Sequence, residues 1–95
     1  MAPVPKQIVS LVEHHQILLS KKARHQLDIG KIDTDDLTHS ILYGKVVKKE
    51  RDERKESKYK YTIIGPSHSG TSVYSCGKII KLLKRTYFII TSHED

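Results

Sequence analysis

The spacing of apolar residues in the first part of the chain predicts an amphipathic helix over residues 4–15. Ile8, Leu11 and Val12 follow one another at steps of three and one, which places them on one side of a helix. Pro5 falls in the first turn, where a missing backbone N–H does no harm. We expect this apolar side to pack against the rest of the protein.

Two further helices are predicted from capping residues. Ser20 is a good N-cap for the stretch "KKARHQLD", which Gly30 ends. Asp33 caps the next helix, and Gly44 is expected to end it with a left-handed residue. The stretch "QILLS", which precedes the second helix, is compatible with a short extended segment.

After Gly44 the pattern changes to the alternation and the β-branched and aromatic residues that are typical of strands. The connections between the strands are too short for helical crossovers, so an antiparallel sheet is expected. The mixed-charge segment 48–58 has no apolar residue, and we interpret it as a solvated hairpin loop. The predicted strands are "KVVKKERD", "KYKYTIIG", "TSVYSCGKIIKLL" and "TYFIITSH".

The order of these elements predicts an α+β fold, with N-terminal helices followed by a four-stranded antiparallel sheet. A chain of 95 residues has room for one domain, so residues 1–95 are expected to form a single unit. The helices would cover one face of the sheet and leave the other free. Because both faces carry apolar residues, the alternation does not indicate which face meets the helices.

The distribution of charge favours a polyanionic partner, and nucleic acid in particular. The net charge is +6. Residues 1–56 contain eleven Lys and Arg against nine Asp and Glu, whereas residues 57–93 contain six against none. The positive charge is therefore concentrated in the C-terminal part of the chain.

Other function classes are disfavoured by what the sequence lacks. Cys76 is the single cysteine, which excludes an internal disulfide and favours a cytoplasmic protein. His14 and His15 are adjacent, so on a helix they point about 100° apart and cannot chelate one ion together. We therefore expect no metal and no cofactor, and the short apolar stretches indicate neither a signal peptide nor a membrane span.

Three stretches of the chain are specific enough to compare with known domains: "ILYGKVV", "YTIIGPSHSGTSVY" and "FIIT". Together they resemble a small prokaryotic domain of unassigned function, which is itself similar to the RelE/MqsR-type toxins of toxin–antitoxin pairs. The resemblance covers residues 17–94. Relatives carry a His-Ala pair where this chain has Lys22 and Ala23, and His25 lies one turn further on.

The resemblance implies a RelE-like fold and cleavage of mRNA without a metal, by attack of a 2′-hydroxyl on the adjacent phosphate. It also implies RNA as a partner, including mRNA on the ribosome, and a cognate antitoxin protein. Such an endoribonuclease needs a group that orients the nucleophile, a cation and a proton donor. Tyr61, Arg85 and His93 are our candidates for these three catalytic roles.

A second set of residues is predicted to bind RNA, with lysines on phosphates and tyrosines stacked on bases. The same residues would serve a non-catalytic module that binds nucleic acid or a protein, or a toxin relative that has lost its chemistry. The sequence leaves open which of these the protein is, and whether it is an enzyme. The predicted binding residues are Lys58, Lys60, Tyr59, Tyr74, Lys78 and Lys81.

Overall fold

The computed structural model describes residues 1–52 and 59–95. The first four residues of the segment 48–58, which the sequence assigns both to the strand "KVVKKERD" and to a loop, belong to strand β3 (Lys45–Arg51). The remainder of that prediction, and Lys58 with it, falls largely outside the described residues.

The three predicted helices are present, with shorter bounds than expected for the first. They are α1 (Lys6–Glu13), α2 (Lys21–Ile29) and α3 (Thr34–Leu42). The side chain of Ser20 accepts a hydrogen bond from the N–H of Ala23 and caps α2. Asp33 and Asp36 form a reciprocal capping box at the start of α3.

Six strands form one mixed sheet in the order β1-β3-β4-β5-β6-β2. All neighbouring pairs are antiparallel except β2 and β6, which run parallel. The strands are β1 (Ala2–Pro3), β2 (Ile17–Leu19), β3 (Lys45–Arg51), β4 (Tyr59–Pro66), β5 (Ser72–Lys81) and β6 (Arg85–Glu94).

The predicted fold class was therefore wrong in its sheet. The four predicted strands are present, but β1 precedes the first helix and β2 lies between α1 and α2, so helices do not simply come first. These two short strands add one row at each edge of the sheet, and β2 makes it mixed instead of antiparallel. The extended segment expected in "QILLS" is confirmed as β2, but the sequence does not indicate that it joins the sheet. The two-residue β1 carries too little alternation to be seen in a sequence.

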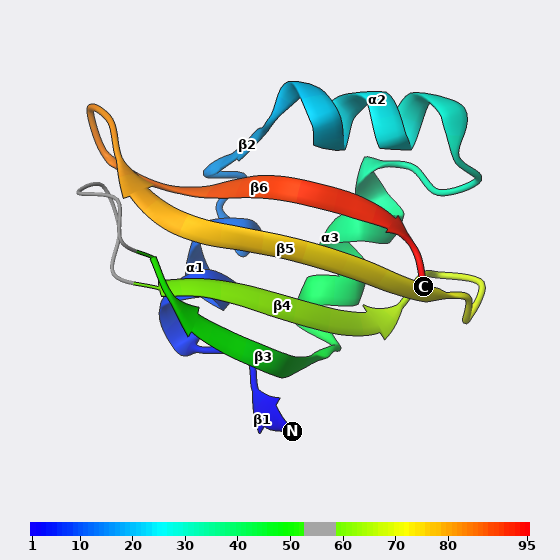
Figure 1. The fold of residues 1–95 in the computed structure, drawn as a ribbon, viewed down its shortest axis with the longest axis horizontal. Helices are drawn as coiled ribbons and strands as arrows, with labels where there is room; N and C mark the ends of the chain where they lie inside the picture. Colours follow the sequence, from blue (N-terminus) through cyan, green and yellow to red (C-terminus); the bar gives the residue numbers. More distant parts are fainter. Residues whose placement is uncertain (53–58) are drawn as a thin grey trace.

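The core lies between one face of the sheet and the helices (Figure 1). In that view α1 and α3 lie behind the sheet, and α2 runs along its β6 edge. Ile8, Leu11, Val12, Leu37 and Ile41 come from α1 and α3 and pack against the sheet. The sheet contributes Val46, Ile63, Val73, Tyr87 and Ile89 to the same cluster.

Helix α2 protects the part of β6 that the short β2 does not reach. The Ser20 hydroxyl donates a hydrogen bond to the carbonyl oxygen of Ile90 at 2.7 Å. The Gln26 side-chain oxygen accepts one from the N–H of Ser92 at 2.9 Å. These side chains replace a neighbouring strand and satisfy an edge that would otherwise be open to pairing.

Gly44 has a different role from the one predicted. The C-cap of α3 is Tyr43, and among the described glycines only Gly70 has a positive φ, of 90°. A Cβ atom on Gly44 would clash with the carbonyl oxygen of Ser40 and lie 2.7 Å from that of Ile64. Glycine is therefore needed here because α3, β3 and β4 approach one another closely.

No helix within the described part of the chain is both long enough and apolar enough to cross a membrane.

Candidate nucleic-acid interface

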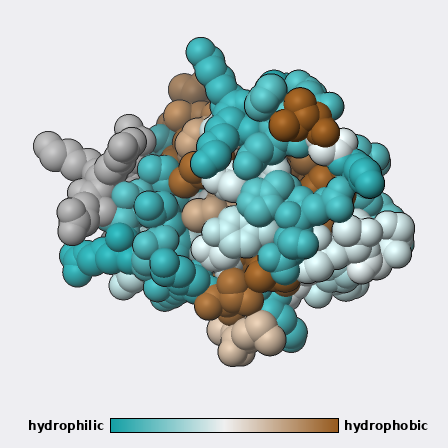
Figure 2. Space-filling model, turned by 45° about the vertical axis from the view of Figure 1, so that its right-hand side comes forward, coloured by the Kyte–Doolittle hydropathy of each residue, from teal (hydrophilic) through white to brown (hydrophobic). Residues whose placement is uncertain are grey.

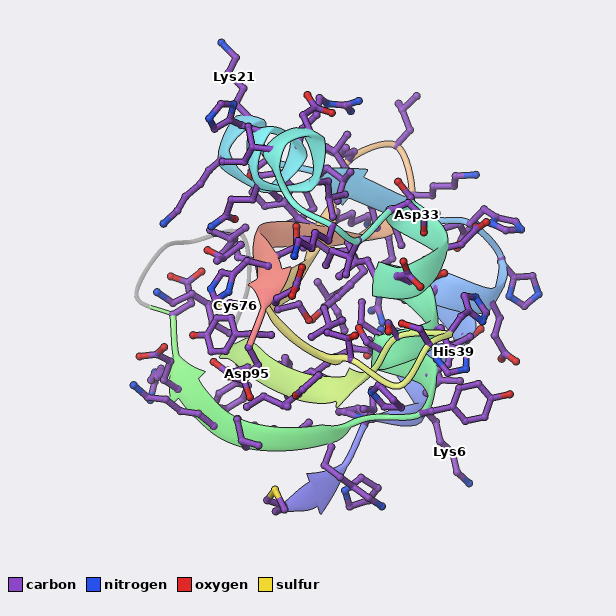
Figure 3. All side chains as sticks on the ribbon, turned by 90° about the vertical axis from the view of Figure 1, so that its right-hand side faces the viewer. Lys6, Lys21, Asp33, His39, Cys76 and Asp95 are labelled. Carbon is purple, nitrogen blue, oxygen red and sulfur yellow. The ribbon has the colours of Figure 1, made fainter. Side chains whose placement is uncertain are left out.

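The strand register sorts the predicted site residues between the two faces of the sheet. Lys60 lies opposite Lys78 in the β4–β5 pair, and Tyr74 lies opposite His93 in the β5–β6 pair. All four lie on the face away from the core cluster, which we call the open face. In Figure 3, which looks along the sheet, Cys76 marks this face and His39 lies on the side of α3.

His93 reaches the open face because of a β-bulge. Cys76 pairs with Thr91 but the next residue of β5, Gly77, pairs with Ile89, which leaves Ile90 as an extra residue in β6. Strict alternation would put His93 on the same side as Tyr87. The bulge inverts the sides beyond Ile90, so His93 lies on the face opposite to that of Tyr87.

Tyr74 and His93 form a stacked aromatic pair at one end of the open face. Their ring centroids lie 4.8 Å apart, with 13° between the ring planes. The Nδ1 of His93 donates a hydrogen bond to the carbonyl oxygen of Glu94 at 2.6 Å, which holds the ring in its orientation. Both side chains are partly exposed, so a flat ring could stack against this pair.

Lys60 and Lys78 lie towards the other end of the same face, but their environments differ. The Lys78 ammonium lies 3.1 Å from Oδ2 of Asp52, and the two side chains are only 8% and 6% exposed. Lys60 is partly exposed and lies opposite Glu50 on its other side. Lys60 is therefore the cation of this pair that an incoming phosphate can reach, while the charge of Lys78 is already compensated.

The middle of the open face is formed by small hydroxyl and thiol side chains. Thr62, Cys76 and Thr91 lie side by side across β4, β5 and β6. Burial raises the pKa of the Cys76 thiol, and a hydrogen bond with Thr62 opposes that rise only in part. This row is therefore neutral at physiological pH and separates the aromatic pair from the lysines by about 13 Å along the strand.

Tyr59 and Tyr61 lie on the other face, where Tyr61 packs against the core cluster. Their rings lie 6.5 Å apart, and the Nζ of Lys49 lies 4.2 Å from the Tyr59 ring centroid. The alternation of lysine and tyrosine in β4 therefore divides the predicted binding residues between two faces, and they do not form one surface.

Arg85 and Lys81 lie opposite each other at the base of the β5–β6 turn, and both are exposed. Arg85 and His93 are eight residues apart on β6, which corresponds to about 26 Å in a strand. Tyr61 and His93 point to opposite faces. The structure therefore does not bring together the three residues predicted to be catalytic, and no single phosphate lies within reach of all of them.

Asp52 is the main site residue that the sequence did not reveal. The pairing of Lys60 with Lys78 could have been found by counting outwards from the turn between β4 and β5, since each pair lies equally far from it. Nothing comparable marks Asp52, which follows the last residue of β3 and contacts Lys78 of β5, a strand that is not adjacent to β3. Within residues 1–52 and 59–95 there is no cluster of three or more metal-ligating side chains.

Comparisons with known proteins add no relative to these observations. No family model matches the chain, no curated protein matches it, and no solved structure matches it. The resemblance to the toxins therefore has no support beyond the sequence stretches that suggested it.

Proposed function

We propose that the protein is an RNA-binding module that holds single-stranded RNA on the open face of its sheet. The observation that carries the proposal is the cross-strand pairing on that face. Tyr74 and His93 offer a stacking surface at one end, and Lys60 offers a cation towards the other. Stacked bases and phosphates held by cations are the two contacts that single-stranded nucleic acids make with sheet surfaces.

The charge and polarity of the surface support a polar ligand. The net charge of +6 attracts a polyanion, and Lys60 is a partly exposed cation on the open face itself. Lys81 and Arg85 are exposed at the end of the β5–β6 hairpin but alternate to the other face of the sheet, so they add to the net charge and not to this surface. Figure 2 shows that hydrophilic side chains cover most of the side in view, and that apolar side chains form small, separate patches there. Such a surface fits a nucleic acid better than a large apolar protein interface.

RNA binding is better supported than RNA cleavage. Cleavage by 2′-hydroxyl attack needs an orienting group, a cation and a proton donor around one phosphate. Tyr61, Arg85 and His93 are distributed over two faces and both ends of the sheet. The protein would act in the cytoplasm, where the toxin resemblance also places its RNA partner.

The proposal can be tested by fluorescence anisotropy with a labelled oligouridine. We expect Tyr74→Ala and His93→Ala each to weaken binding about 5- to 150-fold, the range for loss of one stacked base. Tyr43→Ala is the matched control, because Tyr43 is an exposed tyrosine at the end of α3, away from the open face. It should bind as the wild type does.

The contribution of charge can be measured on the same RNA. The logarithm of affinity should fall with the logarithm of salt concentration by about 0.7 per phosphate contacted, and Lys60→Ala should reduce that slope by about one contact. Lys6→Ala, on α1 and distant from Cys76 in Figure 3, should leave the slope unchanged. Absence of RNA binding, or binding that none of the open-face variants weakens, would refute the proposal.

An incubation of a long RNA with the protein in chelator distinguishes binding from cleavage. We expect the RNA to remain intact. Fragments with cyclic phosphate ends, lost in His93→Ala, would show that the protein is an enzyme after all.

A further inference from the structure

A cavity opens beside the aromatic pair, between the end of α2 and the end of β6. It has a volume of about 350 Å³, which lies within the range of small-ligand pockets. Ile29 and Ile32 supply apolar walls, and Gln26, His93 and Glu94 supply polar groups. Because His93 both lines the cavity and stacks on Tyr74, the cavity adjoins the proposed RNA surface.

The hydrogen bond made by Gln26 fixes what its amide can offer to a ligand. Its side-chain oxygen accepts from the backbone N–H of Ser92, so the oxygen must face β6. The amide nitrogen, with two N–H groups, is then left to donate. Gln26 therefore presents donors to an occupant of the cavity.

Glu94 supplies hydrogen-bond acceptors, which complement the donors of Gln26. It is exposed at the end of β6, and an ionised carboxylate offers only acceptors. Two oxygens in a fork fit a ligand that has two adjacent N–H donors. The cavity thus combines a donor, a double acceptor and two apolar walls.

We propose that this cavity receives one base of the bound RNA and selects guanine. Guanine presents two neighbouring donors, N1–H and the 2-amino group, which match the Glu94 carboxylate. Its O6 is an acceptor for the Gln26 amide, and its flat ring can lie against the apolar side chains that line the cavity. Adenine, cytosine and uracil each have only one donor group on the corresponding edge, next to an acceptor that the carboxylate would repel.

This inference rests on the proposed RNA binding, and it can fail separately. The test compares two oligouridines by fluorescence anisotropy, one of which has a single central guanosine. We expect the guanosine to raise affinity about 5- to 150-fold, the range for one good bidentate base contact. Replacement of that guanosine by inosine, which lacks the 2-amino group, should remove most of the gain.

Glu94→Gln should abolish the preference for guanosine and leave the affinity for plain oligouridine within about twofold, because the stacking pair is intact. Glu13→Gln is the matched control, an exposed carboxylate on α1, and it should keep the preference. Equal affinity of the wild-type protein for both RNAs would overturn the inference, as would a preference that survives Glu94→Gln.

If no RNA binds, the proposed function fails, and a second measurement then tests the guanine pocket separately. Guanosine and adenosine are titrated separately into the isotope-labelled protein, and backbone amide shifts are followed. Shifts at Gln26, Gly30, Ile32 and His93 with guanosine, and weaker ones with adenosine, would support the pocket by itself. No shifts at these residues, or equal shifts with both nucleosides, would overturn it.

Discussion

The ion pair between Lys78 and Asp52 is the most consequential single contact on the open face. Both side chains are nearly buried, at 8% and 6% exposure, so removal of the lysine would take away a cation that lies 3.1 Å from the Asp52 carboxylate in a poorly solvated site. We expect Lys78→Met to lower the free energy of unfolding by about 3 kcal/mol. Denaturant unfolding followed by circular dichroism measures it.

Lys81→Met provides the control for that substitution. Lys81 lies on the same strand, three residues further on, and is exposed, so its loss should change stability by no more than about 0.5 kcal/mol. Equal effects of the two substitutions would mean that Lys78 is solvated in solution.

Cys76 gives a second prediction at the residue scale. Burial raises the pKa of its thiol, so the native protein should react with a disulfide reagent more slowly than the unfolded protein does at the same pH. The half-maximal rate should also shift to higher pH in the native state. Since the folded pKa is the higher one, this thiol stabilises the fold below its ordinary pKa and loses that contribution as pH rises. A native rate equal to the unfolded rate would contradict its half-buried position.

At the scale of elements, Asp36 links the start of α3 to the turn between β4 and β5. Its Oδ1 accepts from the N–H of His68 at 3.1 Å, and its Oδ2 accepts from the N–H of Asp33 at 3.2 Å. The hydrogen bond from His68 has the largest effect on the pKa of the Asp36 carboxyl, and together with the bond from Asp33 it holds this pKa below its ordinary value. The carboxylate therefore favours the folded state above its ordinary pKa, and this contribution is lost as pH falls through the folded value.

The expected result is a loss of stability on acidification that Asp36→Asn reduces. Unfolding free energies measured between about pH 7 and about pH 3 should fall less in this variant than in the wild type. Asp35→Asn removes a carboxylate from the same helical turn without these bonds to His68 and Asp33, and serves as the control. Parallel curves for Asp36→Asn and the wild type would exclude this role.

The elements also show how far the sequence could lead. The starts of α2 and α3 could be predicted because Ser20 and Asp33 act within their own helical turn. The side on which His93 lies could not, because the extra residue at Ile90 depends on the partner strand. The same holds for Asp52, whose partner lies 26 residues further along the chain. Local signals thus located the elements, while contacts distant in sequence determined the candidate site.

At the scale of the whole molecule, both edges of the sheet are made by residues from the first part of the chain. β1 borders β3, and β2 borders β6. The N–H of Tyr87 donates to the oxygen of Gln16, and the N–H of Ser20 donates to the oxygen of Ile89. Leu18 lies midway between Gln16 and Ser20, so in a parallel pair its own N–H and C=O also face β6. The backbone of Leu18, more than its 41% exposed side chain, should therefore matter for the β6 edge.

Leu18→Pro should accordingly destabilise the protein and promote self-association, because it removes a ladder hydrogen bond and uncovers an edge strand. Leu18→Thr keeps the N–H and suits a strand, so it should remain folded and monomeric. Thermal unfolding and light scattering measure the two effects. Equal behaviour of the two variants would show that the β2–β6 pairing contributes little to stability.

The parallel pairing of β2 with β6 also sets a condition on the time course of folding. Ile17 pairs with Tyr87, and the Ser20 hydroxyl contacts the Ile90 oxygen at a separation of 70 residues, so segments far apart in the sequence are neighbours. A nascent chain that has emerged from the ribosome as far as β5 contains β2 and β5 but lacks β6, the strand that lies between them. The sheet is complete only once β6 lies between β5 and β2. Folding should therefore be slow for a chain of this size, and a nascent chain whose β6 is still inside the ribosome should depend on protection from aggregation.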